Sequence, residues 1–291
     1  MKTSHPRALL PDFEIARRLH RKHGTSYYFA TRFFPPDTRL ATWALYAFFR
    51  VPDEIVDNSP QKTDADVARV TEKLQAWRDQ WQVAHETQKS DDPILRVASY
   101  VFHRYNIPFE YSEAFLDAMT SDLTKTEYAT YAELKEYMYG SAAVVGLMMS
   151  HVIGFKDRSA LGYAEKLGYA MQLTNFLRDI DEDYQERKRV YFPQDELQKF
   201  NLSNEDIAAR KFSPRFKDFT QWQAARAQRL YDDSMNGVPL LEAHGRFPVR
   251  CAAALYSAIL GKLEDQGWNV FAGRARTSKT EKIKLAWQAR K

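Results

Sequence analysis

Two short stretches of the chain each carry a pair of aspartates at a spacing suited to binding a metal ion. Asp53 and Asp57 form the first pair, and Asp179 and Asp183 form the second. On an α-helix, residues four apart lie one above the other on the same face, so each stretch presents a row of two carboxylates. Facing rows repel unless a cation lies between them, and Mg²⁺ commonly binds through a few carboxylates plus substrate phosphate. The spacing predicts a magnesium-bridged phosphate or diphosphate site inside a helical bundle.

A single Asp-x-x-x-Asp spacing is weak evidence for such a site. With 38 acidic residues in 291, roughly one or two such spacings arise by chance, and a lone pair is more often a solvated helix face. Here each stretch also has an arginine at the same edge, Arg50 or Arg178. The second stretch adds Gln172 and Asn175, an amide row that an exposed helix face does not need. These additions favour one buried site shared by the two stretches.

Composition indicates a folded, helical chain. Hydrophobic residues make up 44% and aromatic residues 14%, and alternating β-type segments are scarce. The sequence has no repeat and no long linker, so residues 1–291 are expected to form one all-α domain. The net charge of +4 is too small to indicate nucleic acid as a partner. The single cysteine, Cys251, excludes an intramolecular disulfide, fits a reducing compartment and is expected to be a buried helical thiol.

Periodicity and turn residues place the two aspartate pairs in helices over residues 37–57 and 159–187. The turn residues Asn58, Ser59 and Pro60 should end the first helix, which Pro52 should kink. Further helices are expected, in chain order, over residues 12–22, 63–88, 93–104, 108–120, 131–154, 213–235, 248–266 and 277–288.

The helix expected over residues 131–154 changes character at Gly140. It is amphipathic before that residue, and small and apolar on nearly every side after it, which predicts burial. The small residues Ser141, Ala142 and Gly146 leave space beside the helix. That space fits either tight helix packing or the wall of a cavity for a long apolar ligand. We expect these three residues on the cavity side, with Tyr137 towards the metal site.

Together these stretches resemble the squalene/phytoene synthase family, from His23 to about Arg274. The family's first signature resembles residues 46–57, and its second resembles residues 172–183 followed by residues 189–195. The resemblance implies an isoprenoid-synthase-type helical bundle with a central cavity.

The resemblance also implies roles for individual residues. The resemblance implies that Asp53, Asp57, Asn175, Asp179 and Asp183 are magnesium ligands. The same residues could also bind Mn²⁺. Catalytic roles fall to the four aspartates and to Tyr137, which matches a tyrosine placed near the reacting carbons. Substrate contacts are implied at His23, Ser26, Tyr46, Arg50, Gly146, Gln172, Asn175, Arg178 and Arg274, the last only if one residue is inserted after Tyr256.

The implied activity is the head-to-head condensation of two allylic prenyl diphosphates through a cyclopropylcarbinyl diphosphate. Phytoene from two C20 geranylgeranyl diphosphates is the first expectation, because the first motif reads Asp-Glu-Ile-Val-Asp and no C-terminal membrane anchor is expected. Dehydrosqualene or squalene from two C15 farnesyl diphosphates is the alternative, since tunnel depth sets chain length. A non-catalytic family member acting as an assembly factor is less favoured, because all four motif aspartates are intact.

The sequence also bears on location. The N-terminus lacks the apolar core of a signal peptide, and the longest apolar run, residues 142–149, is shorter than the roughly 20 residues that span a bilayer. We expect a cytoplasmic protein with no nucleic-acid partner. The cationic segments at 17–22 and 279–291 would permit peripheral attachment to the inner membrane surface. They would equally suit a basic helical protein, but such a protein does not explain a buried carboxylate row.

Overall fold

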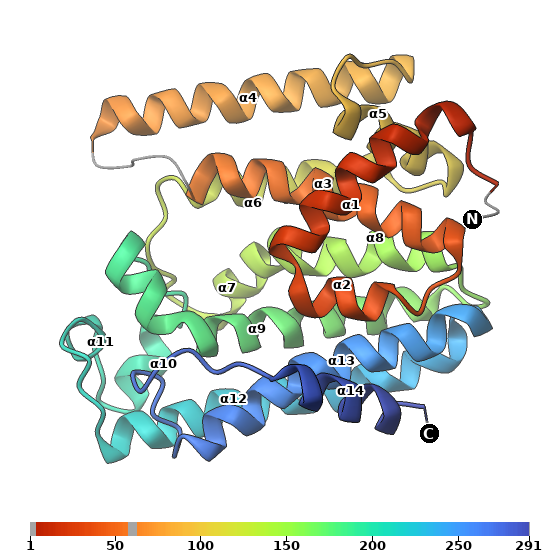
Figure 1. Cartoon of the computed structure of the whole chain (residues 1–291). Coiled ribbons are helices and arrows are strands. Elements are labelled where there is room, and N and C mark those ends of the chain that lie inside the picture. The colour runs from red at the N-terminus through yellow and green to blue at the C-terminus, as the bar shows by residue number, and fades with distance from the viewer. Residues whose placement is uncertain (1–3, 58–62, 291) are drawn as a thin grey trace.

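The computed structural model of the chain describes residues 4–57 and 63–290. The predicted helix stop at residues 58–60 and the last basic residue, Lys291, lie outside the described residues. The described part is built from helices with two isolated bridges, so the prediction of an all-α fold is confirmed. Figure 1 shows the helices in successive layers, from α4 at the top to α12, α13 and α14 at the bottom. The assignment of residues 1–291 to a single domain stays a prediction.

The first half of the chain contains α1 Leu10–His23, α2 Thr25–Thr31, α3 Pro36–Asp57, α4 Asp64–Thr87, α5 Pro93–Arg104, α6 Phe109–Ser121, α7 Tyr131–Met138 and α8 Val144–Ile153. The second half contains α9 Ser159–Arg187, α10 Gln194–Lys199, α11 Asn204–Ala208, α12 Pro214–Ser234, α13 Ala243–Asp265 and α14 Lys279–Gln288. Short 3₁₀ turns, η1 and η3, cover Arg7–Leu9 and Met235–Leu240. None of the described helices is long and apolar enough to cross a lipid bilayer.

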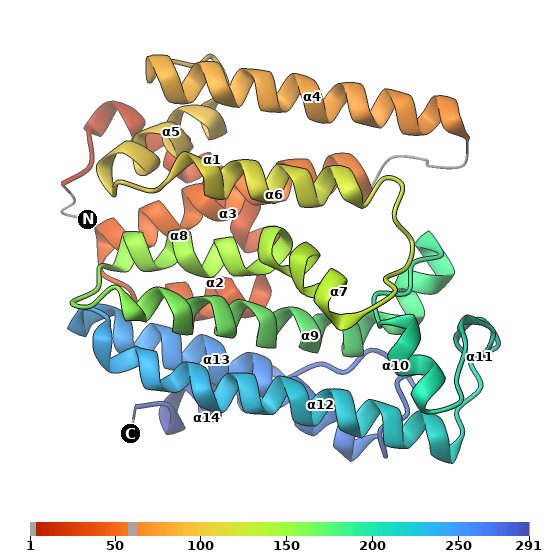
Figure 2. The ribbon, with the colours of Figure 1, turned by 180° about the vertical axis from the view of Figure 1, so that it is seen from behind.

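The two helices that carry the aspartate pairs, α3 and α9, agree with the predicted ranges and hold central places in the fold. One face of α3 packs against α5 and α4, where the Phe48 ring lies 4.6 Å from the Trp81 ring. The Trp81 indole N–H donates to Ser112 of α6 over 2.9 Å, which satisfies its buried donor. On the other side of the cavity, α9 packs against α8, α12 and α13 (Figure 2). This packing leaves the acidic faces of α3 and α9 towards one another.

The single helix predicted over residues 131–154 is wrong in one respect. A π-helical turn, η2, spans Tyr139–Ala143 and separates α7 from α8. At Gly140 a Cβ atom would lie 2.3 Å from the carbonyl oxygen of Ala114 in α6, so only glycine allows this approach. Single π-turns within helices are frequent at functional sites. Here the turn changes the direction of the segment between Tyr137 and Ser141.

Other differences concern element boundaries. Helix α13 begins at Ala243 and not at Pro248, so Pro248 is its sixth residue, and its missing N–H costs the helix one intrahelical hydrogen bond. The short helices α2, α10 and α11 were not predicted, since five to seven residues are too few for a periodic signal. Cys251 is a buried thiol of α13, as expected, and burial raises its pKa to about 11.

Candidate active site

A cavity of about 530 Å³ lies between α3 and α9 and is lined by all four predicted aspartates. The prediction that both pairs face one central cavity therefore agrees with the structure. Arg187, at the end of α9, contacts both aspartate pairs and so shows that they lie close together. Its Nε is 3.1 Å from Asp57 of α3 and its Nη1 is 3.6 Å from Asp183 of α9. One guanidinium group thus bridges the two carboxylate rows.

Further arginines accompany the aspartates on each helix. The guanidinium of Arg50 donates to Asp53, and that of Arg178 donates through Nε to Asp179 over 2.8 Å. Arg274, in the segment between α13 and α14, places its Nε 2.9 Å from Asp179 and its Nη1 2.9 Å from Glu182. The predicted late arginine therefore reaches the second carboxylate row.

The carboxylates remain crowded despite these arginines. Burial raises the pKa of Asp183 to about 8, with the charge of Asp179 adding to the effect and Arg187 opposing it. Burial, followed by the charge of Asp57, also raises the pKa of Asp53. The Asp53 side chain is still 38% accessible, because it faces into the cavity while protein surrounds the carboxylate elsewhere. Further positive charge at this site would be strongly attracted.

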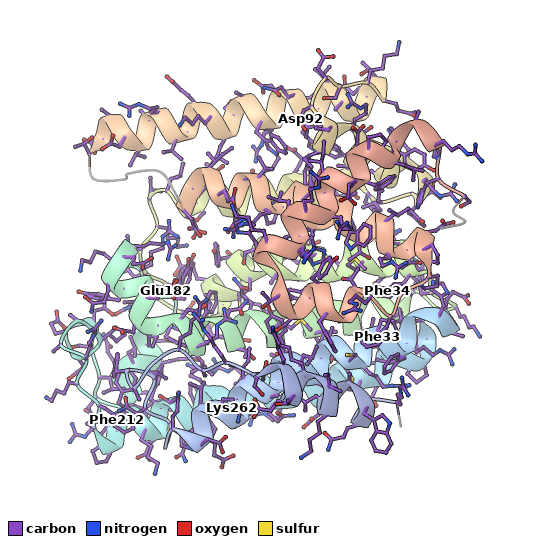
Figure 3. The ribbon with its side chains drawn as sticks, viewed as in Figure 1. Phe33, Phe34, Asp92, Glu182, Phe212 and Lys262 are labelled. Carbon is purple, nitrogen blue, oxygen red and sulfur yellow. The ribbon has the colours of Figure 1, made fainter. Side chains whose placement is uncertain are left out.

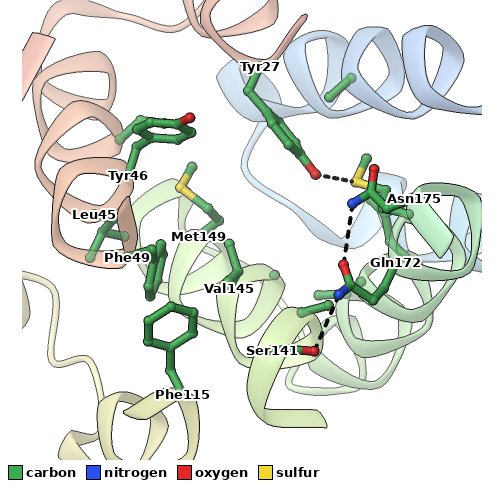
Figure 4. Close-up of a pocket in the computed structure, with 18 of the residues that line it drawn as sticks. Tyr27, Leu45, Tyr46, Phe49, Phe115, Ser141, Val145, Met149, Gln172 and Asn175 are labelled. Carbon is green, nitrogen blue, oxygen red and sulfur yellow. Dashed lines mark hydrogen bonds between the residues drawn. The ribbon is translucent and has the colours of Figure 1, made fainter. Parts of the chain in front are cut away.

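The donor set fits Mg²⁺. Asn175 donates through Nδ2 to Gln172 over 3.3 Å, and Gln172 donates to Ser141 over 3.5 Å (Figure 4). The Oδ1 atom of Asn175 is buried, and no hydrogen-bond donor among the described residues reaches it. This oxygen extends the row of Asp179 and Asp183 and completes an all-oxygen set of the kind that Mg²⁺ and Mn²⁺ prefer.

The protein side chains alone do not close around an ion. Within residues 4–57 and 63–290, no three His, Cys, Asp or Glu side chains converge on a point that could hold a metal. Because Mg²⁺ usually keeps several non-protein oxygen ligands, the remaining oxygens would come from a phosphate group or water. The two rows therefore fit a ligand-bridged metal site better than a closed structural one.

A second polar cluster, unpredicted from sequence, lies in the cavity wall around Asp122. The Tyr137 hydroxyl donates to Asp122 over 2.8 Å, and the Tyr191 hydroxyl lies 3.4 Å from the other carboxylate oxygen. The guanidinium of Arg189 donates to the Asp122 backbone carbonyl and lies 3.8 Å from its carboxylate. Burial raises the pKa of Asp122 to about 6, although Arg189 and Tyr137 act to lower it. This cluster fixes the predicted Tyr137 on the cavity wall.

Beyond these polar groups the cavity is apolar and aromatic. The wall formed by α7, η2 and α8 contains Tyr137, Ser141, Ala142 and Gly146, as predicted, and continues through Val145, Met149 and Ile153. Figure 4 shows Leu45, Phe49 and Phe115 on the opposite side, from α3 and α6. The far end is closed by residues of α2, the start of α9, α13 and neighbouring turns: Ala30, Thr31, Phe34, Ala160, Leu241, Pro248, Val249 and Ala252.

Gly146 agrees with both interpretations of the small residues, tight helix packing and a cavity wall. It lines the cavity, yet a Cβ atom there would lie 2.7 Å from the backbone carbonyl oxygen of Ala164 in α9. The glycine therefore allows α8 and α9 to pack closely, and any larger residue would first disturb that contact.

The remaining predicted residues lie at or behind the polar end. Tyr46 lines the cavity and stacks on His20 with ring centroids 3.9 Å apart. His23 lies 3.1 Å from Glu54, and Glu54 accepts a hydrogen bond from Arg50, which lines the cavity. His23 is therefore connected to the cavity wall only through Glu54 and Arg50. Ser26 is half-buried, and among the described residues that line the cavity neither Ser26 nor His23 is found. Their implied contacts with substrate stay predictions.

Fold and site together define a helical protein with an acidic, arginine-rich cavity end and a deep apolar end. The squalene/phytoene synthase family model matches residues 20–281. The chain is 33% identical to phytoene synthase 2, chloroplastic, of Solanum lycopersicum over 90% of this chain and 84% of that protein. It is 32% identical to phytoene synthase of Thermus thermophilus over 96% and 93% of the two chains. A crystal structure of a dehydrosqualene synthase superimposes with a TM-score of 0.88 and 26% identity, covering 97% and 96% of the chains.

These matches extend over most of the chain and of its relatives. The chain belongs to the squalene/phytoene synthase family. The predicted isoprenoid-synthase-type bundle with a central cavity is confirmed by the fold and by its similarity to solved members of the family.

Proposed function

We propose that the protein condenses two allylic prenyl diphosphates head to head, releasing diphosphate. The observation that carries this proposal is a single cavity with facing carboxylate rows at one end and a long apolar wall at the other. A prenyl diphosphate has the same two-part chemistry, a highly charged head on a hydrocarbon chain. Its diphosphate would lie between α3 and α9, and its chain along α8.

At the polar end, the residues named above would bind and neutralise the diphosphate. Asp53, Asp57, Asp179, Asp183 and Asn175 would hold Mg²⁺, which when bound supplies positive charge for departure of the diphosphate. Arg50, Arg178 and Arg274 pair with these carboxylates and would turn to the phosphate oxygens as substrate enters. Stabilising charge where it develops in the transition state is commonly the largest contribution to catalysis.

In the apolar part, the first allylic cation would be attacked by the double bond of the second substrate, and loss of a proton from the resulting cation would close the three-membered ring of a cyclopropylcarbinyl diphosphate. A second ionisation, rearrangement and proton loss then give a linear polyene. The aromatic and aliphatic walls exclude water, which would otherwise quench the cations. The Tyr137 hydroxyl donates its hydrogen to Asp122, so its oxygen lone pairs remain available to positive charge in the cavity.

Phytoene from two geranylgeranyl diphosphates is the product we propose first. Its support is that relatives from a bacterium and from plants, aligned over nearly the whole chain, are phytoene synthases. A specific observation favours dehydrosqualene from two farnesyl diphosphates as second candidate, namely the close similarity to a dehydrosqualene synthase structure. Either product is an apolar hydrocarbon, so we extend the proposal to peripheral association with a membrane.

One incubation tests the proposal. Purified protein is supplied with Mg²⁺ and either radiolabelled farnesyl or geranylgeranyl diphosphate, and the organic extract is analysed by mass. We expect a C40 polyene from the C20 substrate, and loss of turnover when a chelator removes divalent ions. A C30 product alone would favour the second candidate. No product from either substrate, with well-folded protein, would refute the enzyme function and favour a non-catalytic family member.

A further inference from the structure

The last helix, α14, exposes two large apolar side chains to solvent. Ile283 is 62% exposed and Trp287 is 66% exposed, more than any other large hydrophobic residue among those the structure describes. The two are four residues apart in α14, so they lie on one face about one turn apart. By contrast, the tryptophans Trp77 and Trp81 are buried in the core. An exposed Ile–Trp pair on one helix face is therefore unusual for this molecule.

Cationic residues surround this pair. Between residues 276 and 290 the sequence has five basic residues and one acidic residue, Glu281. Glu281 is neutralised by Lys262 of α13, which lies 2.5 Å away. Lys279, Lys284 and Arg290 are exposed. An apolar centre with basic flanks complements an anionic lipid surface, where tryptophan favours the interface and lysines and arginines favour the headgroups.

The helix is held firmly from its other side. Leu285, Ala286 and Ala289 pack into a small cluster with Cys251 and Leu255 of α13, with Phe29 of α2 and with Phe33 just after α2. A capping box between Ser278 and Glu281 fixes the start of α14, and Arg250 donates to the carbonyl of Ala289 at its end over 3.1 Å. The core therefore fixes the orientation of Ile283 and Trp287 without burying them.

The same cluster backs the apolar end of the cavity. Phe29 of α2 and Phe33 just after it belong to the α14 cluster, Thr31 and Phe34 line the cavity, and Ala30 does both. Figure 3 shows Phe33 and Phe34 at the junction of α2 with α13. The views from front and back place α14, α2 and the basic helix α1 on one side of the molecule (Figures 1 and 2). Helices α2 and α13 thus stand between α14 and the apolar end of the cavity.

We propose that α14 docks the protein on an anionic lipid bilayer, with Ile283 and Trp287 inserted among the acyl chains. Lys279, Lys284 and Arg290 contact the headgroups. In this arrangement the side of the molecule that carries α2 and α13 faces the membrane, with α14 between these helices and the lipid. The docking surface stands on the α14 geometry alone and does not depend on the proposed function.

The test is co-sedimentation of the full chain with vesicles. One set contains equal parts of phosphatidylglycerol and phosphatidylcholine, and the other contains phosphatidylcholine only. We expect binding to the anionic set that weakens with salt, and about a tenfold lower vesicle affinity for the double variant Ile283→Ser/Trp287→Ser. Lys284→Glu should weaken binding to anionic vesicles alone. The matched control is Val83→Ser on α4, which removes another largely exposed apolar side chain, 56% accessible, from a different part of the surface.

Each result decides the proposal. Wild-type protein that sediments with neither vesicle set, or a double variant that binds like wild type, would overturn it. So would an equal loss in Val83→Ser, which would indicate general stickiness. A dimer that the double variant converts to a monomer, with no vesicle binding, would show that a second copy covers this face. Product formation in detergent is measured in parallel, so a failure of the enzyme function is recognised separately from a failure of docking.

Discussion

The two ends of the cavity are built by different means. At the polar end, charged side chains of α3 and α9 hold one another in place, as Arg187 does between Asp57 and Asp183. At the apolar end, shape alone sets the geometry, through residues of α2, α8 and α13 packed around Phe34 and Ile153. Buried charges are costly unless paired, whereas apolar contacts have no directional requirement.

This difference separates two properties of the proposed reaction. Ionisation of the diphosphate depends on the polar end, where a change of one atom alters the charge balance. Chain length depends on the apolar end, where a change of volume alters the space but leaves the charges as they were. Substitutions at the polar end should therefore lower turnover with any substrate, whereas substitutions at the apolar end should change the preferred chain length.

The largest effect is expected at the polar end. Asp179→Asn removes a carboxylate that pairs with Arg178 and Arg274 while keeping the side-chain shape. We expect turnover to fall by about a thousandfold, because charge stabilisation in the transition state is lost. Steady-state kinetics with saturating Mg²⁺ measures this. The matched control is Asp181→Asn, two residues along α9, whose carboxylate pairs with Arg210 outside the cavity lining.

The control should keep most of its activity, since Asp181 does not face the cavity. If both variants lose activity equally, the loss comes from the general charge of α9 and the site assignment is wrong. If Asp179→Asn retains near-normal turnover, the carboxylate rows do not carry the chemistry.

A smaller fall in turnover is expected from a substitution at Tyr137, which lies between the polar and the apolar ends of the cavity. Tyr137→Phe removes the hydroxyl that donates to Asp122 but keeps the ring in the wall. We expect kcat to fall by about a hundredfold with little change in KM, because the oxygen acts on developing positive charge. Tyr128→Phe is the control: its buried hydroxyl meets no partner among the described residues, and its ring lies 5.3 Å from that of Tyr137. A rise in KM without a fall in kcat would instead assign Tyr137 to substrate binding.

At the apolar end the effect should be one of selectivity. Ala160 is a small buried residue beside Phe34, Ile153 and Leu241. Ala160→Phe should shorten the cavity and lower kcat/KM for the C20 substrate about tenfold relative to the C15 substrate, at a packing cost of about 1–3 kcal/mol. Gly146 is a poorer site for this experiment, because a side chain there meets the α9 backbone before it reaches the cavity. An equal loss with both substrates, together with a lowered Tm, would indicate misfolding.

Much of this arrangement could be predicted from the sequence, because it rests on local spacing. The i, i+4 spacing of the aspartates predicted the two carboxylate rows, and the small apolar residues after Gly140 predicted the cavity wall. Arg274 needed the family resemblance, since its partner Asp179 is 95 residues away in the chain.

The rest depends on contacts between distant segments. Nothing in the spacing around Asp122 indicates that its carboxylate accepts from Tyr137 and lies near Arg189, 67 residues further on. Arg187 stands at a helix end, where basic residues are common, and its bridge to Asp57 exists only because α3 and α9 converge. The π-turn at Gly140 follows from close approach to α6, which sequence periodicity cannot show.

The smallest predicted effect concerns the free energy of unfolding, which the buried carboxyl group of Asp122 makes dependent on pH. Burial raises its pKa to about 6, above the ordinary value of 3.8 that applies in the unfolded chain. Between these two values the folded state binds the proton more tightly, so this group's contribution to the free energy of unfolding falls as pH rises towards 6, and the loss is complete above it. Asp122→Asn has no such proton to release. The difference in unfolding free energy, wild type minus Asp122→Asn, should therefore drop by about 1 kcal/mol from pH 5 to pH 8.

Urea unfolding at the two pH values measures this difference. The control is Asp117→Asn, whose carboxylate is exposed and pairs with Arg78 on the outer surface. A difference that stays constant, or that grows with pH, would mean that Arg189 and Tyr137 compensate the buried carboxylate fully.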